Sequence, residues 1–148
     1  MLQLVKDIKA GIRFAARKEM EVCFRLNLTS DIRWEKEIPH IMKKYSHIQF
    51  YDYTKIPNRK LGNIQNYDET FSYSGVKEYQ PMVAKALKKN MRIAVVFRSK
   101  DNQPRTFMGR EVINGDNTDI RPYDKQGVIV SLYAKGKAKK DTSGFVVD

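Results

Sequence analysis

The sequence predicts one α/β domain over residues 1–148, built on a mainly parallel sheet that is either open or a partial barrel. Short apolar runs alternate with helix-like stretches, which is typical of parallel strands joined by helical crossovers. The run Ile93–Phe97 is apolar throughout, as in strands buried on both faces. A chain of 148 residues is also long enough to bury a core without disulfides or metal ions.

The beginning of the chain predicts a helix and then a strand. Residues 2–20 carry apolar side chains at helical spacing: Leu4, Val5, Ile8, Ile12 and Ala16. Basic residues recur every three or four positions and form one stripe: Lys6, Lys9, Arg13 and Arg17. Residues 22–27 then have the composition of a buried strand.

The next part of the chain predicts a helix, a strand and a long loop. A helix over residues 34–45 is expected, with Ser30 or Asp31 as its N-cap. Pro39 lies about one turn inside it, so this helix starts late or has an irregular first turn. A second strand is expected over residues 48–53. The loop 56–68 is long for a compact domain, which makes it a candidate functional loop.

The second half of the chain predicts more strands than helices. The helix over residues 80–90 has Pro81 in its first turn and turns four side chains inward: Met82, Val83, Ala86 and Leu87. The other expected elements are strands at 70–73, 93–97, 112–113 and 127–133, a turn at 114–119, a basic segment at 135–148 that begins as a polar tail, and a return to the sheet at 145–147.

Charge and cysteine content narrow the classes of partner. The 28 basic and 17 acidic residues give a net charge of +11, which favours phosphate-rich partners such as nucleic acid or nucleotides over simple solubility. No apolar stretch reaches membrane-spanning length, and Lys6, Asp7 and Lys9 interrupt any signal peptide. The single cysteine, Cys23, excludes an internal disulfide and suits a reducing cytoplasm.

Four segments form a series that covers nearly the whole chain: RLNLTSDIRWE at 25–35, FYDYTK at 50–55, GD at 115–116 with Asp119 and Arg121, and AKGKA followed by DTSGF within 134–145. In this order they resemble signatures of the gene product 88-like family of bacteriophage proteins. The resemblance implies a phage or prophage origin and a place in the cytoplasm of the bacterial host. It also implies a short form without the upstream cysteine-containing region of longer members. Leu28 stands where members often have glycine, so a close backbone approach there is lost.

Polar residues that follow the first strands suggest a ligand site. Parallel sheets bind ligands at their carboxyl edge, where such side chains converge. The candidates are Asn27, Thr29, Asp31, Tyr53, Lys55 and Ser72. The alternative is that residues 29–31 only cap the following helix and form hydrogen bonds with backbone groups of the turn.

Two basic segments are candidates for nucleic-acid contacts. One is the helical stripe defined above, and the other is a run of four lysines: Lys135, Lys137, Lys139 and Lys140. Such a run can follow a phosphate backbone without reading sequence, although its spacing does not match a phosphate-binding P-loop. If both segments lie on one face they form a channel, whereas a solvated, mobile tail is the alternative for the lysine run.

The loop at 114–124 contains several carboxylates and is a candidate metal site. Three carboxylates lie near Arg121 in the sequence: Asp116, Asp119 and Asp124. A cofactor ion, Mg²⁺, could bind at Asp116 and Asp119. An ordinary turn is favoured, with Arg121 paired to Asp116 or Asp119.

Aromatic residues gather in the middle of the chain. Phe50 and Phe71 are expected in the core, and Tyr53 and Tyr73 at the surface, where bases of single-stranded nucleic acid could stack. Cys23 is expected to be an unreactive strand thiol. His40 and His47 are expected at the surface without a metal.

The sequence therefore favours a non-enzymatic phage accessory protein that binds nucleic acid or a host complex containing it. Phage origin and small size make counter-defence a suitable role, for example inhibition of a CRISPR-type effector. One alternative is a small nucleotide-binding or Mg²⁺-dependent enzyme that uses Asn27, Asp31, Lys55 and Asp116. A second alternative is an inhibitor, for example of a host defence protein, that docks its basic face on an acidic protein surface without nucleic acid.

Overall fold

The computed structural model describes residues 2–101 and 103–148, which divide into two compact units. The N-terminal unit comprises Met1–Asp52 and Lys60–Asp68, and the C-terminal unit comprises Tyr53–Arg59 and Glu69–Asp148. Strands β2 (Gln49–Thr54) and β3 (Tyr67–Ser72) each pass from one unit into the other. Each unit is described by itself below.

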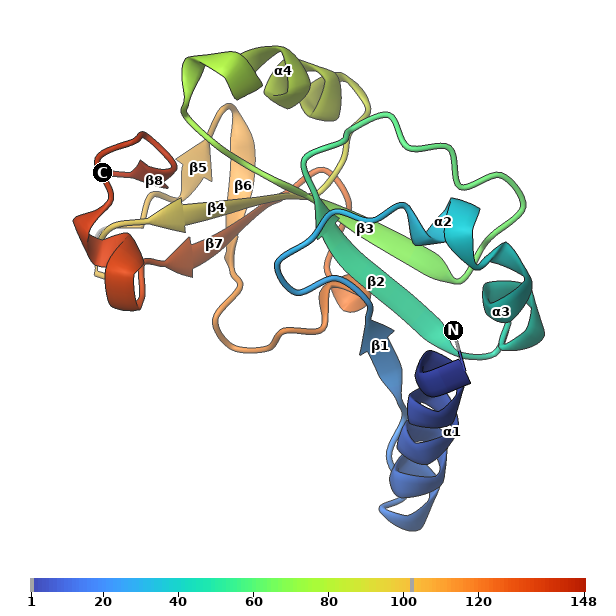
Figure 1. The fold of residues 1–148 in the computed structure, drawn as a ribbon. Helices are drawn as coiled ribbons and strands as arrows, with labels where there is room; N and C mark the ends of the chain where they lie inside the picture. Colours follow the sequence, from blue (N-terminus) through green and yellow to red (C-terminus); the bar gives the residue numbers. More distant parts are fainter. Residues whose placement is uncertain (1, 102) are drawn as a thin grey trace. The chain divides into compact units, whose positions relative to one another are not determined.

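The N-terminal unit packs three helices with the strand β1 and the first part of β2. Helix α1 spans Leu2–Arg17, β1 spans Cys23–Arg25, α2 spans Trp34–Glu37 and α3 spans Pro39–Lys44. Strand β1 pairs in parallel with β2, and α1 lies alongside β1 (Figure 1). The core consists of Ile8, Ile38, Ile41, Met42, Tyr45, Ile48, Phe50, Ile64 and Tyr67.

Three predictions for this unit need correction. Helix α1 ends at Arg17, and Ala15 rather than Ala16 is its buried alanine. The expected buried strand at 22–27 is only three residues long and half-buried, because β1 stands at the end of the strand order. The helix expected over 34–45 is interrupted at Ile38, whose ψ of 42° is not helical, because the residue before a proline avoids helical geometry.

The expected N-cap is also wrong. Arg33 occupies the N-cap position of α2 and makes no side-chain capping bond. Ser30 instead donates its hydroxyl to the side chain of Asn27, at 2.8 Å, so it serves the preceding loop rather than the helix.

The C-terminal unit is a mainly parallel sheet with one long helix. Its elements after β3 are η1 (Lys77–Tyr79), α4 (Gln80–Lys88), β4 (Ile93–Phe97), β5 (Thr106–Phe107), β6 (Arg110–Asn114), η2 (Arg121–Tyr123), β7 (Ile129–Tyr133), η3 (Gly136–Lys140) and β8 (Val146–Val147). Strands β3, β7 and β8 pair in parallel with β4, and β6 pairs in parallel with β7. The hairpin β5–β6 is antiparallel. The α/β class with a mainly parallel sheet is thus confirmed.

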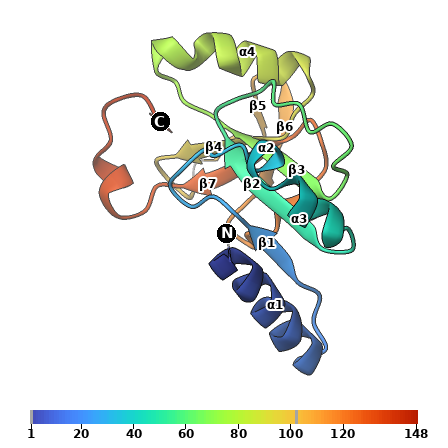
Figure 2. The same ribbon diagram turned by 45° about the vertical axis from the view of Figure 1, so that its right-hand side comes forward.

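Helix α4 covers one face of these strands (Figure 2). Val83 and Ala86 of α4 pack against strand residues that point to the same face: Phe71, Ile93, Val95, Phe97 and Ile129. The predictions of α4, β4, β7 and the returning strand β8 are confirmed within one or two residues. The sequence did not predict β5, and β3 starts three residues before the predicted position.

In the part of the chain that the structure describes, none of the helices has both the length and the apolar character needed to cross a bilayer.

Candidate nucleic-acid interface

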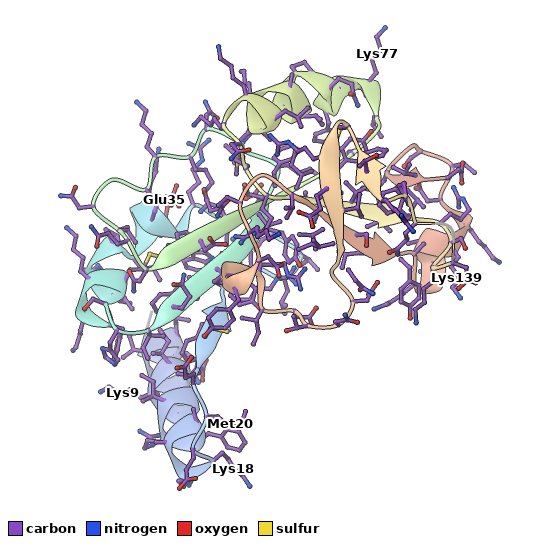
Figure 3. All side chains as sticks on the ribbon, turned by 180° about the vertical axis from the view of Figure 1, so that it is seen from behind. Lys9, Lys18, Met20, Glu35, Lys77 and Lys139 are labelled. Atoms are coloured by element: carbon purple, nitrogen blue, oxygen red, sulfur yellow. The ribbon has the colours of Figure 1, made fainter. Side chains whose placement is uncertain are left out.

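Helix α1 presents a basic face. Lys6, Lys9, Arg13 and Arg17 are all exposed, whereas the opposite side of the helix buries Ile8 and Ala15. At 3.6 residues per turn these four cations fall within an arc of about 80°. The one acidic residue of α1, Asp7, accepts a hydrogen bond of 2.7 Å from Gln3. Figure 3 shows Lys9 extending from this helix and Lys18 at its end. The predicted stripe is therefore a continuous positive surface.

The second basic segment is ordered rather than a mobile tail. Residues 136–140 form the 3-10 helix η3, and Lys135, Lys137, Lys139 and Lys140 are exposed on it or directly before it. Arg98 fixes this segment because its guanidinium donates to the carbonyls of Lys139 and Asp141, both at 2.9 Å. Lys139 extends from η3 in Figure 3. This segment belongs to the C-terminal unit and α1 to the N-terminal unit.

Asp141 closes the turn that follows η3. Its carboxylate accepts hydrogen bonds from the Ser143 hydroxyl, at 2.7 Å, and from the Val146 amide, at 3.1 Å. These two bonds, the hydroxyl first, lower the pKa of Asp141. The turn thereby sets the start of β8.

Acidification is expected to release this turn. A carboxyl group with a lowered pKa in the folded state stabilises that state above its unfolded pKa, which is about 3.9. This contribution disappears as the pH falls through the folded-state pKa. We expect the Val146 amide resonance to titrate with a midpoint below about 3.9 in the wild type and to show no such titration in Asp141→Asn. A midpoint at or above the reference value, or an unchanged titration in the variant, would contradict this assignment.

Asn27 organises the loop after β1 instead of presenting an open side chain. It is buried, and its Oδ1 accepts from Ser30 Oγ at 2.8 Å, Ile32 N at 3.2 Å and Trp34 Nε1 at 2.9 Å. Its Nδ2 donates to the Ile32 carbonyl and to Asp52 Oδ2, at 3.1 and 3.0 Å. Asn27 therefore ties the loop of residues 27–34 to β2.

Asp52 and Tyr67 complete this network, and neither was among the site residues predicted from the sequence. Asp52 is fully buried and accepts from the Asn27 amide at 2.6 Å and from the Tyr67 hydroxyl at 2.5 Å. An aspartate between the aromatic residues Tyr51 and Tyr53 of strand β2 was the available signal. Of the other predicted residues in this unit, Thr29 is exposed and Asp31 half-buried.

Lys55 and Ser72 come together in the C-terminal unit. Lys55 Nζ donates to the Ser72 carbonyl at 3.1 Å, with the Ser72 hydroxyl and the Tyr73 carbonyl at 3.4 Å. It also lies 4.9 and 5.2 Å from the ring centres of Tyr79 and Phe145. The ammonium thus binds the end of β3, and a ligand-binding role for the six predicted edge residues stays a prediction.

The aromatic predictions hold in part. Phe50 and Phe71 are fully buried, as expected. Tyr53 and Tyr73 were expected at the surface but are half-buried, because Tyr53 packs on a small cluster with Val130 and Tyr73 meets Phe107 edge-on at 5.7 Å. They are therefore less open to stacking than the sequence indicated.

The acidic loop at 114–124 is held by internal bonds. Asp116 accepts from the Tyr133 amide at 2.9 Å and from Lys135 Nζ at 2.8 Å. Arg121 is fully buried and pairs with Asp124, at 3.2 Å, so its predicted partner was wrong. Among residues 2–101 and 103–148, no group of three histidine, cysteine or carboxylate side chains is placed to hold a metal ion. The predicted Mg²⁺ at Asp116 and Asp119 stays a prediction.

Cys23 and the two histidines are the remaining reactive side chains. Burial raises the pKa of the half-buried Cys23 thiol, which keeps it in the unreactive protonated form. His40 and His47 are both exposed.

Comparison with known proteins places the chain in a family. The model of the Gene product 88 family matches residues 1–148. The chain belongs to this family. The resemblance predicted from the four sequence segments is thereby confirmed. Neither the curated proteins nor the solved structures contain a match to the chain.

Proposed function

We propose that this member of the Gene product 88 family is a phage accessory protein that binds the phosphate backbone of nucleic acid through the basic face of α1. The observation that carries the proposal is that Lys6, Lys9, Arg13 and Arg17 are all exposed within one arc of a regular helix. A helix holds its cations at fixed spacing, so several phosphates can be neutralised together.

The rest of the charge distribution supports this function. The net charge of +11 attracts polyanions from a distance, and the ordered lysines of residues 135–140 offer further phosphate contacts. Lysine and arginine contacts to phosphates fix position and carry no sequence information. We therefore expect binding that tolerates any base sequence and weakens steeply with salt.

The biological role that we propose is counter-defence, with a host nucleoprotein such as a CRISPR-type effector as the target. Membership of the Gene product 88 family supports the phage origin on which this role depends. The test is affinity purification from a bacterial host lysate with and without nuclease treatment. A nucleoprotein that is lost after nuclease treatment supports binding through nucleic acid. Retention of a defence protein after the treatment would indicate docking on the protein itself.

The helix face is tested by a pair of charge-matched variants. Lys9→Gln with Arg13→Gln is expected to weaken binding to a DNA duplex at least several-fold, because two phosphate contacts disappear. The control is Lys43→Gln with Lys44→Gln on α3, which removes the same charge from two exposed residues of the same unit. Fluorescence anisotropy of a labelled duplex gives both affinities. Equal weakening in the two variants would show that net charge alone, and not the α1 face, drives binding.

A further inference from the structure

Three parallel strands of the C-terminal unit, β4, β7 and β8, end together at one edge. Phe97 at the end of β4 is the register partner of Tyr133 at the end of β7, and Val147 of β8 pairs with Phe97 on its other side. The carboxyl edge of a parallel sheet is where α/β proteins bind ligands. Tyr133 is the residue at this edge from which the chain leads directly into Lys135 and η3.

Two ammonium groups lie over the ring of Tyr133 as cation–π partners. Lys135 Nζ lies 4.6 Å from the ring centre, and Lys100 Nζ, from the loop after β4, lies 5.9 Å from it. Lys100 and Lys135 are both exposed, and Tyr133 itself is only half-buried. An aromatic face with cations around it is the combination that binds single-stranded nucleic acid, because a base stacks on the ring and the cations contact phosphates.

Asp116 fixes the positions of Tyr133 and Lys135 relative to each other. Its two carboxylate oxygens hold the backbone amide of Tyr133 and the ammonium of Lys135, at 2.9 and 2.8 Å. The hydrogen bond from Lys135 raises the pKa of that lysine, so it stays charged. An ammonium has three donors, so the ion pair with Asp116 leaves Lys135 able to donate to a phosphate as well. The fold therefore positions the backbone of Tyr133 and the ammonium of Lys135 before any ligand arrives.

We propose that Tyr133 is a stacking platform for an unpaired base, and that Lys100 and Lys135 bind the phosphates next to that base. The proposal rests on the proposed function and narrows its ligand to single-stranded nucleic acid at this edge. Bases within a duplex are already stacked on each other and cannot lie on a protein ring without leaving the helix. The lysines at 137–140 follow within a few residues and extend the path for the backbone.

The first test compares substitutions that keep or remove the ring. Tyr133→Leu is expected to weaken binding of a short poly-dT strand by about fivefold or more, the loss expected for one stacked base. Binding of a duplex should not change. The matched control Tyr133→Phe keeps the ring and should bind the single strand like the wild type. Circular dichroism checks that both variants are folded.

The second test reads stacking directly and remains decisive if Tyr133→Leu does not fold. In Tyr133→Trp, a stacked base should quench the new indole, so poly-dT should lower the fluorescence by more than it does in the wild type, and a duplex should not. Quenching by the single strand alone supports the proposal. Single-strand binding without extra quenching, or a wild type that binds duplex but no single strand, overturns it and leaves the α1 function standing. A wild type that binds neither overturns both.

Discussion

Replacing Asn27 with Ala is expected to lower the free energy of unfolding of the N-terminal unit by about 3–5 kcal/mol. The substitution leaves the indole N–H of Trp34 and the amide of Ile32 without their acceptor, and removes the donor to Asp52. A buried donor without a partner costs about 1–3 kcal/mol, and these groups lie around one buried side chain. We therefore expect the loop of residues 27–34 to detach from β2 before the rest of the unit unfolds.

Urea denaturation followed by tryptophan fluorescence measures this loss. Trp34 is the single tryptophan of the chain and donates to Asn27 itself, so it reports on the unit in question. The matched control is Ser30→Ala, which removes one exposed donor to the same oxygen and should cost less than about 1 kcal/mol. Similar midpoints for the two variants would show that the loop does not depend on the Asn27 amide.

Replacing Gly115 with Ala is expected to destabilise the C-terminal unit by about 3 kcal/mol. A Cβ atom at this position would lie 2.3 Å from Val130 Cγ1 and 2.9 Å from the Ser131 carbonyl oxygen, both on β7. It would also lie 2.8 Å from Nη1 of Arg121, a fully buried residue whose Nη2 donates to the Gly115 carbonyl. Backbone and a buried guanidinium cannot both move aside, so the loop must shift away from β7 and give up bonds of Asp116 and Arg121.

Thermal unfolding of Gly115→Ala and of Asn117→Ala separates this clash from a general sensitivity of the loop. Asn117 is exposed in the same turn, and its replacement should change the stability by less than about 0.5 kcal/mol. A Gly115→Ala protein as stable as the wild type would mean that β6 and β7 do not approach each other as closely as described.

Elements whose residues specify them locally could be predicted from the sequence. Helix α1 follows from apolar residues at helical spacing, and β4 from an unbroken apolar run between polar residues. Exposure of the basic stripe followed from the same periodicity, since residues opposite a buried face must meet solvent. The Gly–Asp turn after β6 was also recognised from its composition.

Contacts between distant residues could not be predicted in this way. Asp52 meets Asn27 across 25 positions and Tyr67 across 15, and no local pattern pairs them. The partner of Arg121 was missed although it is local, because the 3-10 turn η2 brings Asp124, three positions further on, to the guanidinium in place of Asp116 or Asp119. The carbonyls at the end of β3 that accept from Lys55 were likewise not foreseen, since they lie 17 and 18 positions away from it in the sequence.

The proposed stacking site at Tyr133 could not be predicted from the sequence for the same reason. From the sequence, Tyr53 and Tyr73 were expected to be the exposed aromatic residues in the middle of the chain. Neighbouring strands and the hairpin β5–β6 cover part of both rings. Tyr133 meets Lys100 only because β4 and β7 are register partners, a pairing of strands that are far apart in sequence.

The dependence of duplex affinity on salt tests the central claim most directly. If the four cations of α1 each neutralise one phosphate, a plot of log affinity against log salt for the wild type should have a slope of about −3.6 or steeper. Replacing Lys6, Lys9, Arg13 and Arg17 together with Gln should make that slope shallower by about 3.6. An unchanged slope in the fourfold variant, or no duplex binding by the wild type at low salt, would contradict the account.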